Sequence, residues 1–132
     1  MRVSFTVVGP PVTWKRAARQ GRRTFTNPDL AAYQTSVRYE AMAAFLSQPS
    51  WQTDQRYRLE LTVYAATRKR ADVDNYAKAI MDALNKLAYA DDSQVDELTV
   101  TRHVDPSEPR CEVTIATLSA LSFETHRRAR QK

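Results

Sequence analysis

The chain has 132 residues, of which 42% are hydrophobic and 27% charged, and this composition indicates one globular domain rather than a disordered chain. Its formal net charge of +5 favours a polyanionic partner such as nucleic acid. The chain has one cysteine, two histidines and two glycines. These low counts argue against a disulfide framework, a structural zinc site and glycine-rich phosphate loops.

The apolar patterns predict the element order β-α-β-α-β-β, a single α+β domain with a mixed sheet and two helices. The predicted strands are residues 3–8, 57–66, 95–103 and 110–118, and the predicted helices are residues 28–46 and 75–89. We expect residues 12–27 to form a loop. Residues 119–132 are expected to be a basic, flexible tail, which leaves residues 1–118 as the domain.

No apolar run approaches the roughly 18 residues that a membrane helix needs, and the N-terminus has no signal-peptide pattern. We therefore expect a cytoplasmic protein with no membrane partner.

Charge is unevenly distributed along the chain. Residues 1–28 contain six cations and no acid, whereas residues 71–97 contain seven acids and only two cations. This division predicts a polyanion-binding surface beside a cation-binding pocket, although a solvated surface with uneven charge would give the same pattern. The candidate DNA-binding residues are Lys15, Arg16, Arg19, Arg22, Arg23, Arg68, Lys69 and Arg70. Trp14 and Phe25 lie among them and either stack on exposed bases or pack in the fold.

The second predicted helix presents a polar stripe. At about 100° per residue, Asp74, Lys78 and Asp82 share one face with Asn85. The opposite, apolar face predicts the contact with the core. Asp74 and Lys78 are four residues apart with the acid first, which is the favourable order for an ion pair.

Asp72 and Asp74 are two residues apart in an extended lead-in, so their side chains can point to the same side. Like charges held so close repel each other unless a cation lies between them, and oxygen ligands suit Mg²⁺ or Mn²⁺. The simpler reading makes Asp74 a helix cap, Asp72 and Asp91–Ser93 turn residues, and Lys78 a surface lysine.

The combination of these motifs resembles the signature of the RusA family of Holliday junction resolvases. The matching residues are Asp72-Val73-Asp74-Asn75, Lys78, Asp82-Ala83-Leu84-Asn85 and Asp91-Asp92-Ser93-Gln94-Val95, preceded by Gly9-x-Pro11 and Lys15-Arg16. The likeness spans residues 3–118.

The resemblance implies a homodimer that binds a four-way DNA junction and nicks two strands by Mg²⁺- or Mn²⁺-dependent phosphodiester hydrolysis. By position, Asp72, Asp74 and Asp92 would bind the metal and take part in catalysis. Lys78 would be the catalytic lysine, and Asp91 is the alternative third carboxylate. Such an enzyme would act in DNA recombination and repair in a bacterium or a phage-infected cell.

If the second helix extends to residue 89, it contains about 15 residues between Asp74 and Asp92. A helix of that length would place the two carboxylates roughly 22 Å apart. Either the helix is shorter and the chain folds back, or Asp92 completes the site across a dimer interface, which we expect. Two other functions stay open. One is a non-catalytic module that binds branched DNA, and the other is a metal-dependent nuclease for other branched DNA.

Overall fold

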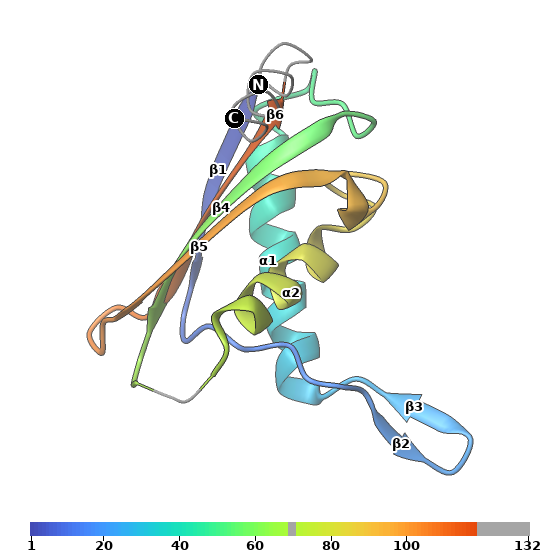
Figure 1. Cartoon of the computed structure of the whole chain (residues 1–132), viewed down its shortest axis with the longest axis vertical. Coiled ribbons are helices and arrows are strands. Elements are labelled where there is room, and N and C mark those ends of the chain that lie inside the picture. The colour runs from blue at the N-terminus through green and yellow to red at the C-terminus, as the bar shows by residue number, and fades with distance from the viewer. Residues whose placement is uncertain (69–70, 119–132) are drawn as a thin grey trace, which may run out of the picture.

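A computed structural model describes residues 1–68 and 71–118, and the elements follow the predicted α+β order (Figure 1). The strands are β1 (Arg2–Val8), β2 (Ala18–Gln20), β3 (Arg23–Phe25), β4 (Arg56–Ala65), β5 (Val95–Val104) and β6 (Arg110–Leu118). The helices are α1 (Pro28–Phe45), α2 (Val73–Leu84) and the short 3-10 helix η1 (Asp92–Gln94).

Four strands form one mixed sheet in the order β1-β6-β4-β5. β6 pairs antiparallel with both β1 and β4, whereas β4 and β5 are parallel neighbours joined through α2. A parallel pair requires a crossover, and α2 supplies it. This crossover is what places α2 and η1 near the β5 edge of the sheet.

Both long helices cover the same face of the sheet (Figure 1). Alternate residues of β4, such as Leu59, Leu61 and Val63, are fully buried on that face, as their spacing predicts. Val37 of α1 and Ile80 of α2 are buried against them. The predicted apolar faces of both helices are therefore confirmed.

The sequence pattern missed a hairpin between β1 and α1. β2 and β3 pair antiparallel across a turn at Gly21, whose φ is +64°. Glycine adopts this backbone conformation without the steric cost that other residues have. The hairpin extends away from the sheet (Figure 1), and strands of three residues are too short to show an alternating pattern.

Among the described residues, no helix is both long and apolar enough to span a membrane. The predicted tail, residues 119–132, lies outside the described residues.

Candidate active site

Two exposed carboxylates lie at the start of α2. Asp72 occupies the N-cap position without a side-chain capping bond, and Asp74 lies in the first turn. Within the described chain, neither side chain has a hydrogen bond or an ion pair. The Arg102 guanidinium of β5 donates to the carbonyl oxygen of Ala71 and holds the lead-in to the helix. Helix capping therefore does not account for these carboxylates, and both are available to a cation.

Lys78 lies one turn further along the exposed face of α2. Its Nζ is 3.5 Å from the ring centroid of Trp14, in a cation–π contact. The ion pair with Asp74 that the spacing favours does not form among the described residues. The backbone N–H of Trp14 donates to the carbonyl oxygen of Asn75 at 2.9 Å, which brings the indole to α2.

α2 ends at Leu84, five residues before the predicted end at residue 89. Asn85 is extended and Lys86 has a φ of +68°, so the chain turns back at this point. The N–H of Lys86 donates to the carbonyl oxygen of Tyr89 at 2.8 Å, and the indole Nε1 of Trp51 donates to Ala88 at 2.8 Å. This local turn and the long-range contact from Trp51 hold the chain in a non-helical path although the apolar periodicity continues. The assumption of a straight helix reaching residue 89 was therefore wrong.

The returning chain enters η1 through a capping box. The N–H of Ser93 donates to Oδ2 of Asp91 at 2.9 Å, and the N–H of Asp91 donates to Oε1 of Gln94 at 2.9 Å. Hydrogen bonding to Ser93 lowers the pKa of Asp91. Gln94 also donates to the carbonyl oxygens of Thr53 and Gln55, each at 2.9 Å, and so fixes η1 to the loop before β4.

This arrangement separates the roles of Asp91 and Asp92. The carboxylate of Asp91 is used in the cap, whereas the negative charge of Asp92 acts on Asp82 of α2. Burial raises the pKa of Asp82, the nearby Asp92 raises it further, and Lys78 opposes both effects. Asp91 thus accepts a capping hydrogen bond and Asp92 acts on Asp82, and the choice of Asp92 as the third carboxylate stays a prediction.

Asp82 lies on the polar stripe of α2 but is not among the site residues that the sequence predicts. Its spacing was the usable signal, because Asp82 lies one turn beyond Lys78 and two turns beyond Asp74. What the spacing could not show was the return of the chain, which places Asp92 beside it.

The donor set suits a hard cation, since all of the candidate ligands are carboxylate oxygens. In the described residues no three acidic, histidine or cysteine side chains form a group that could hold a metal ion. The expected set of Asp72, Asp74 and Asp92 is therefore not assembled within the described chain. Asp92 lies near enough to Asp82 for its charge to raise the pKa of Asp82. Mg²⁺ commonly binds one or two carboxylates together with phosphate oxygens and water.

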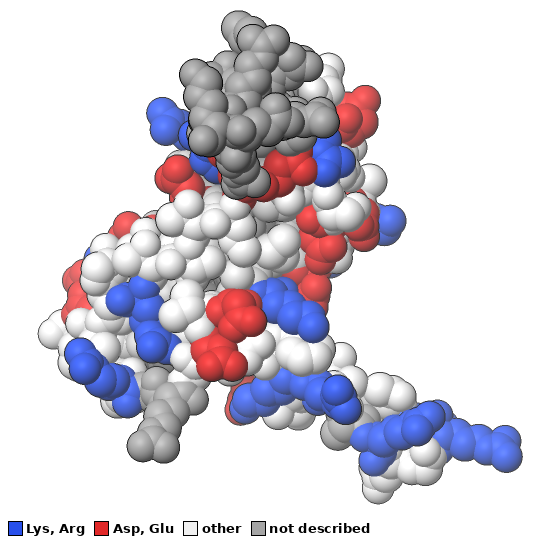
Figure 2. Space-filling model, in the orientation of Figure 1, with Lys and Arg blue, Asp and Glu red and all other residues white. Residues whose placement is uncertain are grey.

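Basic side chains cover the projecting hairpin, and acidic and basic side chains lie near one another on the body beside it (Figure 2). Arg19 is in β2, Arg22 in the turn and Arg23 in β3, and all three are exposed. Lys15 and Arg16 are exposed in the preceding segment. Arg68 is also exposed, whereas Lys69 and Arg70 lie outside the described residues, as does the side chain of Phe25.

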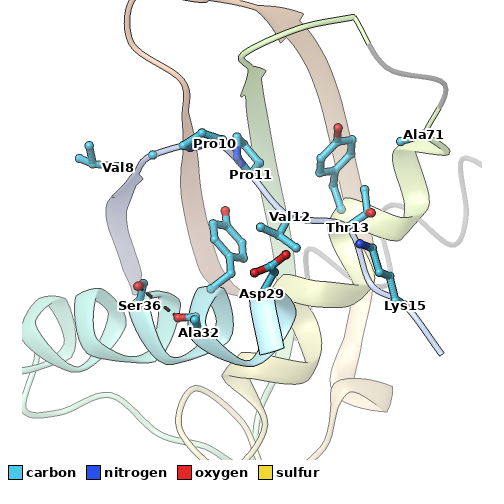
Figure 3. Close-up of a pocket in the computed structure, with 13 residues that line it drawn as sticks. Val8, Pro10, Pro11, Val12, Thr13, Lys15, Asp29, Ala32, Ser36 and Ala71 are labelled. Carbon is cyan, nitrogen blue, oxygen red and sulfur yellow. Dashed lines mark hydrogen bonds between the residues drawn. The ribbon is translucent and has the colours of Figure 1, made fainter. Parts of the chain in front are cut away.

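A pocket of about 520 Å³ adjoins the start of α2 (Figure 3). It lies between the segment after β1, the first turns of α1 and the lead-in to α2. Figure 3 places Lys15, Asp29 and Ala71 around it. None of the candidate metal-binding carboxylates lines this pocket, so it is a neighbour of the acidic site rather than part of it.

The family model described as "Endodeoxyribonuclease RusA" matches residues 9–116, most of the chain and all of the site described above. The chain belongs to the RusA family. The resemblance based on the acidic motifs is thereby confirmed, and the family is one of DNA endonucleases.

A relative of this RusA-family chain is the Bacillus subtilis (strain 168) protein named "Uncharacterized protein YqaN". The two sequences are 32% identical over an alignment 142 residues long. The alignment covers 89% of this chain and 98% of the relative. Among solved structures, "Dihydroxyacetone kinase operon co-activator Dha-DhaQ" matches 95% of this chain with a TM-score of 0.51 and 7% identity. The chain spans 42% of the length of that structure, and the likeness concerns the fold alone.

Proposed function

We propose that this protein resolves four-way DNA junctions by paired, metal-dependent phosphodiester hydrolysis, and that it does so as a homodimer. Paired nicks on strands of a symmetric junction need two sites, and a dimer of one chain supplies them. Such an activity belongs to DNA recombination and repair in the cytoplasm of a bacterium or a phage-infected cell.

The observation that carries the proposal is the arrangement of charge along the exposed face of α2. Lys78 lies between the free carboxylates at the start of the helix and the pair formed by Asp82 and Asp92. Lys78 contacts the Trp14 ring and forms no ion pair with either acid among the described residues. Unpaired carboxylates beside a fixed ammonium group suit a divalent cation and a phosphate.

Each residue then has a defined task in hydrolysis. Asp72, Asp74 and Asp92 are the proposed metal ligands, and Asp82 lies beside Asp92. A bound divalent ion would supply charge neutralisation at the phosphate and a more acidic water. The ammonium group of Lys78 would stabilise negative charge on the reacting phosphate or on the leaving oxygen.

The hairpin and the segment before it supply the DNA contacts in this proposal. Their arginine and lysine side chains would bind backbone phosphates, and such contacts position the duplex arms without reading sequence. The peptide hydrogen bond from Trp14 to Asn75 joins this basic region directly to α2. Phosphates held by Lys15 and Arg16, which directly follow Trp14, would therefore lie nearer to α2 than phosphates held by the projecting hairpin.

The test is cleavage of a synthetic four-way junction beside a linear duplex of the same sequence. We expect paired nicks on the junction with Mg²⁺, no nicks with EDTA, and a loss of at least about 100-fold in the Asp74→Asn variant. Mn²⁺ serves as the alternative metal.

The other outcomes separate the competing functions. Tight junction binding without cleavage under either metal would leave a binding module and reject the proposed hydrolysis. Metal-dependent cleavage of flaps or other branches, with no preference for four-way junctions, would reject the proposed substrate while keeping the nuclease.

A further inference from the structure

We propose that Trp14 is a positioning residue for Lys78. This inference rests on the proposed nuclease function and adds to it a residue that the acidic motifs do not contain. The ring of Trp14 lies 3.5 Å from Nζ of Lys78, and the peptide N–H of Trp14 donates to Asn75, three residues earlier in the helix. The backbone and the side chain of Trp14 therefore both contact the first turns of α2.

Lys78 has other partners within reach along the helix. Asp74 precedes it by four residues and Asp82 follows it by four, the spacing at which charged side chains pair. Neither carboxylate forms an ion pair with Lys78 among the described residues. The indole therefore holds the ammonium group out of ion-pair distance of both acids, while the Lys78 charge still opposes the rise that burial causes in the pKa of Asp82.

Core packing does not account for the position of Trp14. The side chain is half-buried and does not belong to the apolar cluster or to the residues packed against it. A lysine has a flexible four-carbon stem, so an aromatic face above its ammonium group restricts it to fewer positions. Fixing a catalytic ammonium group before the substrate arrives raises the rate of the chemical step.

The same residue begins the basic part of the chain. Lys15 and Arg16 follow Trp14 directly and lead into β2 of the hairpin. The segment that would bind DNA backbone is thus attached to α2 at the residue that holds Lys78. Trp14 couples the proposed DNA-binding hairpin to the proposed catalytic lysine.

The experiment compares Trp14→Ala with Trp14→Phe in single-turnover cleavage and in junction binding with Ca²⁺ replacing Mg²⁺. We expect Trp14→Ala to lower the cleavage rate by about 10-fold while changing the junction Kd by less than about twofold. Trp14→Phe retains an aromatic face and should recover most of the rate. Tyr39→Ala, at an exposed aromatic residue on α1, is the matched control and should change neither quantity.

A second readout does not depend on activity. In the wild-type protein the side-chain protons of Lys78 should show an upfield ring-current shift in NMR spectra, and this shift should disappear in Trp14→Ala. An unshifted Lys78 signal in the wild type would overturn the inference whether or not the protein cleaves junctions. The inference would also be overturned by a Trp14→Ala variant that keeps the full cleavage rate. The same holds for a variant that loses junction binding as much as it loses cleavage. If the Lys78 shift is present but no DNA is cut, the proposed nuclease function fails and the contact stands.

Discussion

At the scale of single residues, the site depends on which charges are paired and which are not. The Asp91 carboxylate accepts a hydrogen bond from the N–H of Ser93, whereas the carboxylates of Asp72 and Asp74 have no partner in the described chain. Asp82 is intermediate: it is partly buried, and the like charge of Asp92 raises its pKa. A carboxylate in such a position is stabilised by any cation that binds between the two groups.

We therefore predict that Asp82→Asn weakens metal-dependent cleavage although Asp82 was not among the expected ligands. Because the charge of the proposed ligand Asp92 acts on Asp82, loss of the Asp82 charge should raise the Mg²⁺ concentration needed for half-maximal cleavage by about 10- to 100-fold. The measurement is junction cleavage across a Mg²⁺ titration. Glu60→Gln, at an exposed residue on β4 in the sheet, is the matched control. Equal Mg²⁺ dependence in wild type and Asp82→Asn would show that Asp82 has no part in the site.

At the scale of elements, η1 is held in place by β4 as well as by its own cap. The Arg56 guanidinium of β4 donates to Asp96 of β5 at 2.8 Å from its Nε, and to the carbonyl oxygen of Ser93 at 2.9 Å. One side chain thus joins the two parallel strands and the 3-10 helix that precedes β5. The position of Asp92 depends on this junction because Asp92 is the first residue of η1.

The Arg56 pair predicts a stability change at low pH. The hydrogen bond from Arg56 lowers the pKa of Asp96, so the pair stabilises the fold fully above the unfolded pKa of about 4. This contribution is lost as the pH falls through the lower, folded pKa. Because the Arg56 side chain is 51% exposed, water screens the pair, and we expect only about 0.5–1 kcal/mol.

The measurement is urea unfolding of wild type and Asp96→Asn at pH 6 and near pH 3. The variant should be less stable than wild type at pH 6, and the difference should shrink at the lower pH. A difference of the same size at both pH values would mean that the Asp96 charge does not contribute.

At the scale of the whole molecule, the two acidic groups lie toward opposite ends of α2. The start of α2 carries Asp72 and Asp74, and its far end carries Asp82 beside Asp92. The fold-back after Leu84 removes the straight 15-residue helix on which the expectation of a composite site was based. A site shared between two subunits stays a prediction.

Mixed dimers test whether the site is shared between two subunits. If Asp74 of one subunit acts with Asp92 of the other, a heterodimer of Asp74→Asn and Asp92→Asn keeps one intact site and should nick one junction strand. A heterodimer of Asp74→Asn and Asp72→Asn is the matched control and should keep none. Single-strand nicking measured with differently tagged, co-purified subunits would support sharing. No recovery in the first heterodimer would place the whole site within one chain.

The elements of the sheet could be predicted from the sequence because their signals are local. Alternation in β4 and the 3.6-residue period in α1 each follow from which face is buried, and Asn27 with Pro28 marks the start of α1. The acidic motifs likewise led to the family, since the match covers residues 9–116. The hairpin was missed because its strands have only three residues each.

What only the tertiary structure decided is where the side chains of the site lie. The fold-back after α2 and the position of η1, which brings Asp92 near Asp82, depend on contacts with residues 51–55, far from α2 in sequence. The position of Lys78 depends on Trp14, 64 positions earlier in the sequence. Periodicity reports which face of an element is buried, whereas long-range contacts determine where the element stops and which charges meet.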